Sequence, residues 1–375
     1  MKKNYLITFI IGTRPEAIKL ASVIKAFNNS EIFKSRIILT GQHKEMVNEL
    51  LEIWEIKPSK NLEIMLPNQT LNYVVSNVIQ KLNDELVKFK PDLLVVQGDT
   101  SSALAGALTA FHLGVPIAHV EAGLRTDDIN EPFPEEANRR LISQLSTLHF
   151  APTRKSAENL KKEGILERVF ITGNTVIDVL LQESKKNFIP KFLKNIDIKN
   201  QKLVLATFHR RENWGENIIN ICCSISEILN KTKDTFFIIP MHKNKIIRDT
   251  ILNLLSKNPK VILTEPLKYN ELISIMKISH FIITDSGGIQ EEAPSLGKPV
   301  LVLRNKTERE EAINAGCAKL VGTEKTKIIQ ECTKLLNDEL SYKRMSNIKN
   351  PFGDGKASSH ILNICKSYLK EKFSV

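Results

Sequence analysis

Three carboxylates in the first half of the chain stand where a side chain could reach a bound ligand. Asp99 and Glu121 each follow a short apolar run, and Glu135 opens a later amphipathic segment. Taken singly, each has a simpler explanation, because an aspartate before a helix commonly caps it and acidic residues commonly open helices. Taken together, they could form an acid and base set whose pKa values are separated by their environments. These residue types therefore predict proton transfer.

Basic side chains follow the first apolar run. The sequence Gly12-Thr13-Arg14-Pro15-Glu16 comes directly after residues 5–11, and Lys19 lies a few residues further on. Proline suits the first turn of a helix, so Arg14 and Lys19 would lie beside a helix amino terminus, a place that favours anions. The pattern is neither a Walker loop nor a GxGxxG motif and does not indicate a nucleotide cofactor. A phosphate site and an ordinary strand-to-helix turn are equally compatible with it.

Residues that could bind a diphosphate follow apolar runs in the second half of the chain. His209 comes after residues 203–208 and precedes two arginines, which favours an anion site over a histidine that is merely hydrogen-bonded within a loop. Ser286-Gly287-Gly288, directly before a helix-like segment, would point backbone N–H groups at a diphosphate. Glu292 could then reach a ribose, and Arg309 could be a further phosphate neighbour or only a surface charge.

The elements that carry these residues alternate along the chain, with short β-branched runs separated by segments of helical period. The runs are continuously apolar, which is typical of a parallel sheet covered on both faces. The predicted fold class is therefore α/β, with two Rossmann-like, doubly wound parallel sheets. Ligands bind outside the carboxyl ends of the strands in such sheets, where the candidate residues lie. The predicted strands are 5–11, 36–41, 92–97, 116–120, 148–151, 169–172, 203–208, 235–240, 260–264, 280–284 and 299–303.

The pattern also predicts the domain organisation. A segment rich in Lys, Asn and Ile, residues 183–201, interrupts the alternation and separates an N-terminal domain, 1–182, from a C-terminal domain, 202–355. The last stretch, 356–375, contains an amphipathic helix that we expect to pack back on the N-terminal domain.

Composition excludes several classes of protein. The chain has 375 residues, of which 42% are hydrophobic and 25% charged, close to the average of globular domains. Its longest apolar runs are strand-sized, so no membrane-spanning segment is expected, and the amino-terminal run is too short for a signal peptide. Five cysteines without a CxxC pair predict a reduced, cytoplasmic protein without a zinc site. The net charge of +11 comes largely from scattered lysines without interleaved aromatic residues, which argues against nucleic-acid binding.

Seven motifs, in order along the chain, resemble those of one family. They are GTRPEAIK at 12–19, GDT at 98–100, HVEAGLRT at 119–126, PEEANR at 134–139, GNTVID at 173–178, HRREN at 209–213 and DSGGIQEEAPSLGKPVL at 285–301. Nearly the whole chain thereby resembles the non-hydrolysing UDP-N-acetylglucosamine 2-epimerases. This resemblance implies a GT-B arrangement, in which two Rossmann-like domains face each other across a cleft. It also implies interconversion of UDP-N-acetylglucosamine and UDP-N-acetylmannosamine for cell-envelope polysaccharides, without cofactor or metal, by a homodimer.

The resemblance implies roles for individual residues. Elimination of UDP to a bound glycal, followed by re-addition, requires carboxylates for the C2 proton and positive charge for the diphosphate. The proton-handling set would be Asp99, Glu121 and Glu135, without a decision about which is the base, and His209 would act on the diphosphate side. The UDP contacts would be Arg14, Lys19, Ser286, Gly287, Gly288 and Arg309, and Glu292 would contact the ribose. Leu267 and Leu272 would lie near the uracil, and the family often has Phe at the position of Leu272.

An activator site is a further implication, because bacterial members can bind a second UDP-N-acetylglucosamine. The matching residues are Gln42, His43, Gln69, Glu136, Arg210 and His242. Some activated members carry Gln and Arg where this chain has Glu45 and Asn68, so we expect the site to be weakened.

Three alternative functions remain. A GT-B glycosyltransferase would share the fold and the UDP site but would need an acceptor. A hydrolysing epimerase would release UDP and free N-acetylmannosamine, but such relatives depart from the Pro-Glu that this chain has at Pro15 and Glu16. A non-enzymatic polyanion-binding protein would explain the basic charge and leave the three carboxylates without purpose.

Overall fold

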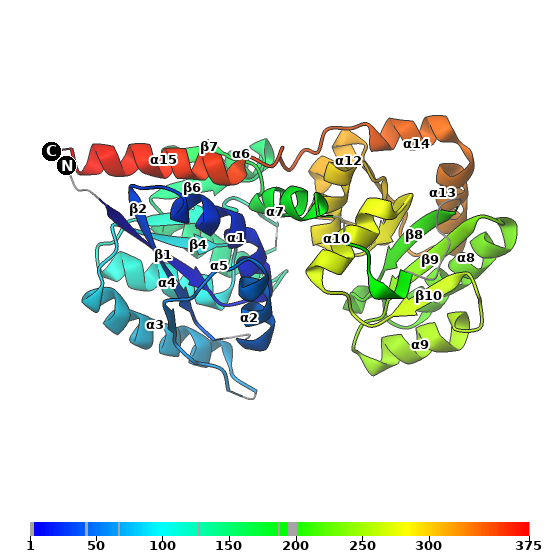
Figure 1. The fold of residues 1–375 in the computed structure, drawn as a ribbon, viewed down its shortest axis with the longest axis horizontal. Helices are drawn as coiled ribbons and strands as arrows, with labels where there is room; N and C mark the ends of the chain where they lie inside the picture. The colour runs from blue at the N-terminus through cyan, green and yellow to red at the C-terminus, as the bar shows by residue number, and fades with distance from the viewer. Residues whose placement is uncertain are drawn as a thin grey trace. The chain divides into compact units, whose positions relative to one another are not determined.

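Two parallel β-sheets form the frame of the protein (Figure 1). The structure is a computed structural model and describes residues 4–41, 44–66, 68–126, 128–186, 188–193 and 201–374. It divides into two units, Met1–Val179 with Phe352–Val375, and Leu180–Pro351. The sheet of the first unit has seven strands in the order β3-β2-β1-β4-β5-β6-β7, and that of the second has six in the order β10-β9-β8-β11-β12-β13. The predicted α/β class with two doubly wound parallel sheets is confirmed.

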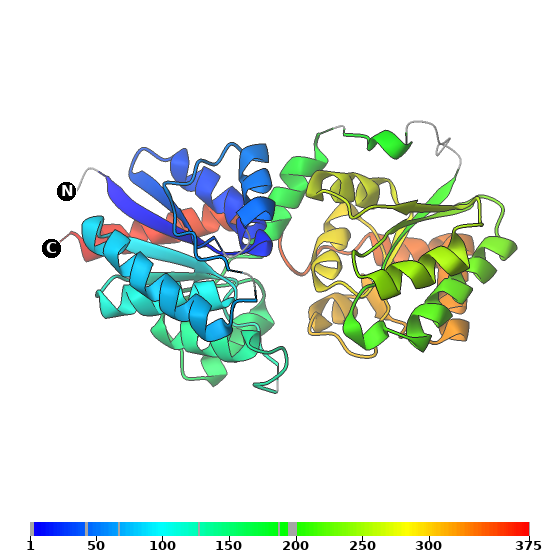
Figure 2. The same cartoon turned by 90° about the horizontal axis from the view of Figure 1, so that it is seen from below.

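The first unit has helices on both faces of its sheet (Figures 1 and 2). Helix α1 packs against α2 and α15, whereas α3, α4 and α5 pack together on the other face. Its strands are β1 Tyr5–Ile11, β2 Phe33–Leu39, β3 Lys60–Asn61, β4 Leu93–Gln97, β5 Ile117–Val120, β6 Leu148–Ala151 and β7 Val169–Ile171. Its helices are α1 Arg14–Asn28, α2 Lys44–Ile53, α3 Leu71–Lys88, α4 Ser101–His112, α5 Glu135–Leu145, α6 Arg154–Lys162, α7 Thr175–Ser184, which crosses the unit boundary, and α15 Ala357–Lys372.

The second unit repeats this plan. Helix α8 packs against α9 and α13, while α10 contacts β8 and the 3-10 turn η3. Its strands are β8 Lys202–Thr207, β9 Thr235–Pro240, β10 Val261–Thr264, β11 Phe281–Thr284, β12 Val300–Val302 and β13 Ala318–Leu320. Its helices are α8 Glu216–Lys231, α9 Lys245–Leu255, α10 Tyr269–Ile278, α11 Gly287–Glu292, α12 Glu310–Ala315, α13 Lys325–Asn337 and α14 Glu339–Ser346, with 3-10 turns η1 Lys191–Leu193, η2 Arg211–Asn213 and η3 Ala293–Leu296.

Local sequence explains why the strands lie where they do. The central strands β4 and β5 are buried along their whole length, as expected of a sheet covered on both faces. The structure adds two strands that the sequence did not predict, β3 and β13, because they have only two and three residues and contain lysine. Strand β2 begins three residues earlier than predicted, where Phe33 pairs with Tyr5 of β1.

Each unit has its own apolar core. In the first, Val96 and Leu94 of β4 join a cluster with Val78 and Leu82 of α3 and Ile142 of α5. In the second, the cluster joins strands β8, β9 and β11 to α8, α9 and α13. In the part of the chain that the structure describes, every helix is too short or too polar to cross a bilayer.

The carboxyl-terminal helix α15 is held to the first unit by buried polar contacts. Oδ1 of Asp178, on α7, accepts from the Ser358 backbone N–H at 2.8 Å, and Oδ2 accepts from that of Ala357 at 3.1 Å. The hydroxyl of Ser358 also lies 2.8 Å from that of Ser22 on α1. A carboxylate that binds the first N–H groups of a helix satisfies donors that otherwise lack partners. The chain therefore returns to its first unit after completing the second.

Candidate active site

The strand order places two sets of candidate residues at comparable positions. In each sheet the order reverses between two neighbouring strands, β1 and β4 in the first unit and β8 and β11 in the second. The segments that leave neighbouring strands in opposite directions open a crevice at their carboxyl ends, where ligands bind in doubly wound sheets. Arg14 and Asp99 follow β1 and β4, and His209 and Ser286 follow β8 and β11. These four predicted site residues therefore lie at the switch points of the two sheets.

Glu121 is the most constrained carboxylate of the first unit. It directly follows β5, is only 8% exposed and has a backbone φ of 66°, in the left-handed region that non-glycine residues seldom adopt. Its Oε1 accepts from Lys19 Nζ at 2.5 Å and from Asn174 Nδ2 at 3.1 Å, and Gln97 donates to Oε2. The structure thus places the Lys19 ammonium on this carboxylate, a contact that was not predicted from the sequence. A buried carboxylate held by three donors is fixed in orientation.

Asp99 lies on the neighbouring turn, between β4 and α4. The capping residue of α4 is Thr100, whose hydroxyl accepts from the Ala103 N–H at 3.0 Å, so Asp99 is not an N-cap. Its carboxylate instead accepts from Arg139 Nη2 at 2.5 Å, and its backbone carbonyl accepts from Asn138 Nδ2 at 2.8 Å. Burial raises the pKa of Asp99 and the charge of Glu121 raises it further, against the opposing effect of Arg139. The pKa of Asp99 therefore lies above its usual value.

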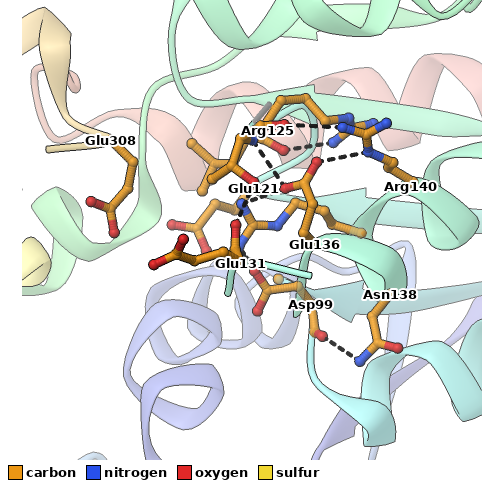
Figure 3. Close-up of polar contacts among 12 residues, drawn as sticks. Asp99, Glu121, Arg125, Glu131, Glu136, Asn138, Arg140 and Glu308 are labelled. Carbon is orange, nitrogen blue, oxygen red and sulfur yellow. Dashed lines mark hydrogen bonds and ion pairs between the residues drawn. The ribbon is translucent and has the colours of Figure 1, made fainter. Parts of the chain in front are cut away.

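The two adjacent glutamates of the PEEANR motif open helix α5, and Figure 3 shows the second of them, Glu136, beside Arg140. Glu135 is the first residue of the helix and is partly exposed. Glu136 has no exposed side-chain surface, and its oxygens accept from Arg140 Nε at 2.7 Å and from the Thr126 N–H at 3.1 Å, with Arg139 Nη1 at 3.3 Å. A role for Glu136 in an activator site requires that one of these partners be displaced.

Two residues of the first unit support the turns that carry the candidate site and were missed in the sequence. Glu16, 1% exposed, accepts from the Gly12 and Thr13 N–H groups at 2.9 and 2.5 Å and from the Thr100 hydroxyl at 2.7 Å. It thereby ties the turn after β1 to the turn after β4. His119 lies with Nε2 at 2.8 Å from the Gly98 carbonyl, and burial lowers its pKa to about 3, so it is neutral and donates there.

In the second unit, His209 lies next to the fully buried carboxylate of Asp285. Oδ2 of Asp285, the residue after β11, accepts from the His209 and Arg210 N–H groups, both at 2.8 Å, and from Asn213 Nδ2 at 3.0 Å. Its Oδ1 lies 3.5 Å from His209 Nδ1. Burial lowers the pKa of His209, and Asp285 works against this. Asp285 was not predicted as a site residue from the sequence, although it directly follows a strand.

Arg309 reaches the start of helix α11. A Cβ placed on Gly287 would lie 3.0 Å from the Arg309 guanidinium carbon, so the absence of a side chain there makes room for the guanidinium. Arg309 Nε donates to Glu291 at 2.9 Å, and Nη1 lies 3.1 Å from Glu308. Burial works to raise the pKa of Glu308, but Arg309 and Arg304 outweigh it and hold that pKa at about 2. An arginine beside the first N–H groups of a helix is an arrangement suited to a phosphate, although the Ser286 N–H itself donates to the Thr284 hydroxyl at 2.9 Å.

The expected nucleoside side of the site lies next to this helix start. Glu292, 6% exposed, accepts from the Tyr269 hydroxyl at 2.9 Å through Oε2. Leu272 is on α10 and Leu267 just precedes that helix, and both are partly exposed. Tyr269, also on α10, orients Glu292 and was not predicted from the sequence.

The structure describes four of the six predicted activator residues. Gln42 and His43 lie outside the described residues, and the Gln69 side chain accepts from the Leu66 N–H at 3.2 Å. His242 stacks on His209 with ring centroids 5.4 Å apart, and Arg210 Nη2 lies 3.8 Å from Glu308 Oε1. Over the ranges that the structure describes, no three His, Cys, Asp or Glu side chains could hold a metal ion together.

Comparison with known proteins gives relatives over the full length of the chain. Residues 25–366 match the family model described as UDP-N-acetylglucosamine 2-epimerase. The chain is 47% identical over 375 residues to the UDP-N-acetylglucosamine 2-epimerase of Campylobacter jejuni, with 97% of each chain covered. Its structure is similar to that of UDP-GlcNAc 2-epimerase from Neisseria meningitidis bound to UDP-GlcNAc, with 47% identity, a TM-score of 0.88 and coverage of 96% of this chain and 100% of that one. The enzyme from Methanocaldococcus jannaschii, in complex with UDP-GlcNAc and UDP, is similar at 36% identity and a TM-score of 0.79, with 96% and 99% covered.

Proposed function

This chain belongs to the UDP-N-acetylglucosamine 2-epimerase family, and from that premise we propose that it interconverts UDP-N-acetylglucosamine and UDP-N-acetylmannosamine. The family resemblance carried by the sequence motifs is thereby confirmed. The proposed substrate has support from two similar structures, which hold UDP-GlcNAc. We further propose that the enzyme acts in the cytoplasm as a homodimer and supplies cell-envelope polysaccharide synthesis.

The pair Glu121 and Asp99 is the observation that carries this proposal. The hydrogen on C2 of the sugar is not next to a carbonyl and is barely acidic, but it can leave as a proton if the C1–O bond to UDP breaks in the same elimination. One carboxylate must then accept a proton and another must deliver one to the opposite face of C2. Glu121 lies against the Lys19 ammonium, whereas burial and the charge of Glu121 work to raise the pKa of Asp99. The two carboxyls therefore lie in different environments.

The second unit supplies what the departing diphosphate needs. Arg309, the N–H groups at the start of α11 and His209 can stabilise the negative charge that develops on the phosphate oxygen. Glu292 can accept a ribose hydroxyl while Tyr269 holds its other oxygen. A glycal with UDP still bound would be the intermediate, and re-addition of UDP to C1 restores the sugar nucleotide.

Isotope exchange tests the proposed reaction. We expect incubation with UDP-N-acetylglucosamine in deuterated water to yield UDP-N-acetylmannosamine, with deuterium at C2 of both sugar nucleotides, because the C2 proton is exchanged on a carboxylate. Mass spectrometry and proton NMR measure this. Retention of the original hydrogen through many turnovers would rule out elimination. Release of free N-acetylmannosamine and UDP would instead indicate a hydrolysing epimerase, and a lack of reaction without an acceptor would favour a glycosyltransferase.

A weakened activator site is a separate proposal, supported by Arg210 and His242 beside His209. The asparagine at position 68 offers no positive charge to an activator diphosphate, and one charge-assisted hydrogen bond contributes roughly 1.5–3 kcal/mol, about ten- to a hundredfold in affinity. We expect UDP-N-acetylmannosamine alone to turn over and added UDP-N-acetylglucosamine to stimulate the rate modestly. Complete dependence on micromolar activator would contradict this.

A further inference from the structure

The buried carboxylate of Asp285 lies behind His209 in the second unit. Asp285 has no exposed side-chain surface, whereas the His209 side chain is 43% exposed. Three N–H donors, from the His209 and Arg210 backbones and the Asn213 side chain, converge on Oδ2. They fix the plane of the carboxylate and leave Oδ1 buried, without a hydrogen-bond partner among the described residues and 3.5 Å from His209 Nδ1.

This geometry favours Nδ1 as the nitrogen of His209 that carries the hydrogen. A carboxylate oxygen can only accept, so an imidazole that faces it through Nδ1 places its hydrogen on that atom. Nε2, on the far side of the ring, is then the atom that can take or give a proton. The stack with His242, whose ring plane is tilted by only 7° from that of His209, limits rotation of the imidazole about this contact.

We propose that Asp285 is the positioning residue for His209: it holds the hydrogen of the neutral ring on Nδ1 and stabilises the imidazolium that forms when Nε2 takes up a proton from solvent. The Nε2–H of this imidazolium then donates to the phosphate oxygen that leaves C1. This rests on the proposed epimerisation. When the C1–O bond breaks, its electron pair goes to the phosphate oxygen, and the C2 proton goes to a carboxylate of the first unit. The hydrogen bond from Nε2 to the phosphate oxygen strengthens as charge develops there, and it weakens again when UDP re-adds to C1.

The charges around His209 set the direction of the pH dependence. Burial lowers the pKa of His209, and His242 and Arg210 lower it further, while Asp285 raises it. Without the negative charge of Asp285, the remaining influences all disfavour the imidazolium. The His209 imidazolium is then lost at a lower pH, so turnover begins to fall at a lower pH as the pH is raised.

The Asp285→Asn variant tests this role with almost no change in size. The amide oxygen can still accept the three N–H groups at the Oδ2 position, while its NH2 group faces Nδ1 and forces that atom to accept. We expect histidine ¹⁵N NMR to show a bare Nε2 in the wild type and a protonated Nε2 in the variant, with His209 assigned through His209→Gln. Turnover should fall by roughly 10²- to 10⁴-fold, because the charged donor to the leaving oxygen is lost. The decline of turnover with rising pH should begin at a lower pH than in the wild type. The affinity for UDP should stay within about threefold of the wild-type value.

A matched control removes the same charge elsewhere in the unit. Asp234, half-exposed and 3.8 Å from Lys202, can be replaced by Asn, and this variant should keep the wild-type turnover and tautomer. An unchanged His209 tautomer or wild-type turnover in Asp285→Asn would overturn the proposal. If the Asp285→Asn variant does not fold, the wild-type tautomer alone decides. A hydrogen on Nε2 of neutral His209 would overturn the proposal, and an Nε2 without a hydrogen would support it. The tautomer is measured without turnover, so these outcomes are distinct from a wild type that fails to epimerise.

Discussion

The Glu121→Gln variant should turn over roughly 10²- to 10⁴-fold more slowly than the wild type while binding UDP almost unchanged. Glutamine keeps the size of the side chain but cannot accept or release a proton. It also removes the negative charge that Lys19 contacts at 2.5 Å, so an unneutralised ammonium remains at the site. Steady-state kinetics in both directions and calorimetric titration with UDP separate the loss of turnover from any loss of binding.

Two further variants define what this result means. Glu158→Gln removes the same charge from an exposed ion pair with Arg154 and should leave turnover unchanged. Arg14→Ala should weaken UDP binding itself, because a phosphate contact is lost in the ground state and the transition state alike. If Glu121→Gln and Arg14→Ala both lose only affinity, the role proposed for Glu121 is wrong.

Replacing Gly123 by Ala should destabilise the first unit by roughly 2–6 kcal/mol, the sum of left-handed backbone strain and overpacking. Gly123 has a φ of +89°, and a Cβ there would lie 2.1 Å from the Ser156 carbonyl oxygen on α6. That contact cannot be relieved by a side-chain rotation, because its partner is backbone. Glu121 lies two residues earlier, so any shift of Gly123 also moves the carboxylate. Urea unfolding, followed by circular dichroism, measures the change.

Gly114→Ala is the matched control for this substitution. Gly114 has a φ of +63°, and an added Cβ would meet nothing within 4 Å. The change should cost only the backbone term, about 1–2 kcal/mol. The difference between the two variants therefore isolates the clash with Ser156, and equal unfolding midpoints would show that α6 moves away at no cost.

The positions of the candidate residues in the chain were predictable because they follow from local patterns. The apolar runs before Asp99 and Glu121 are the strands β4 and β5, and both carboxylates leave their strands at the same end of the sheet. The run before His209 is likewise a strand, β8. Strand periodicity depends on neighbouring residues alone, so the sequence by itself determined the α/β class and the side of each sheet that bears the polar residues.

The partners of those residues were decided only by the tertiary structure. Lys19 contacts Glu121 across 102 positions of sequence, and Asp285 binds the His209 N–H across 76. Such pairs depend on which strands become neighbours, and the switch in strand order next to β1 and β8 places residues that are distant in sequence at the same sheet edge. A local pattern can mark Lys19 as a cation near a helix start, but it cannot distinguish a phosphate from a carboxylate of another strand as its partner. The folded sheets bring the Lys19 ammonium to Glu121, where the buried carboxylate stabilises it.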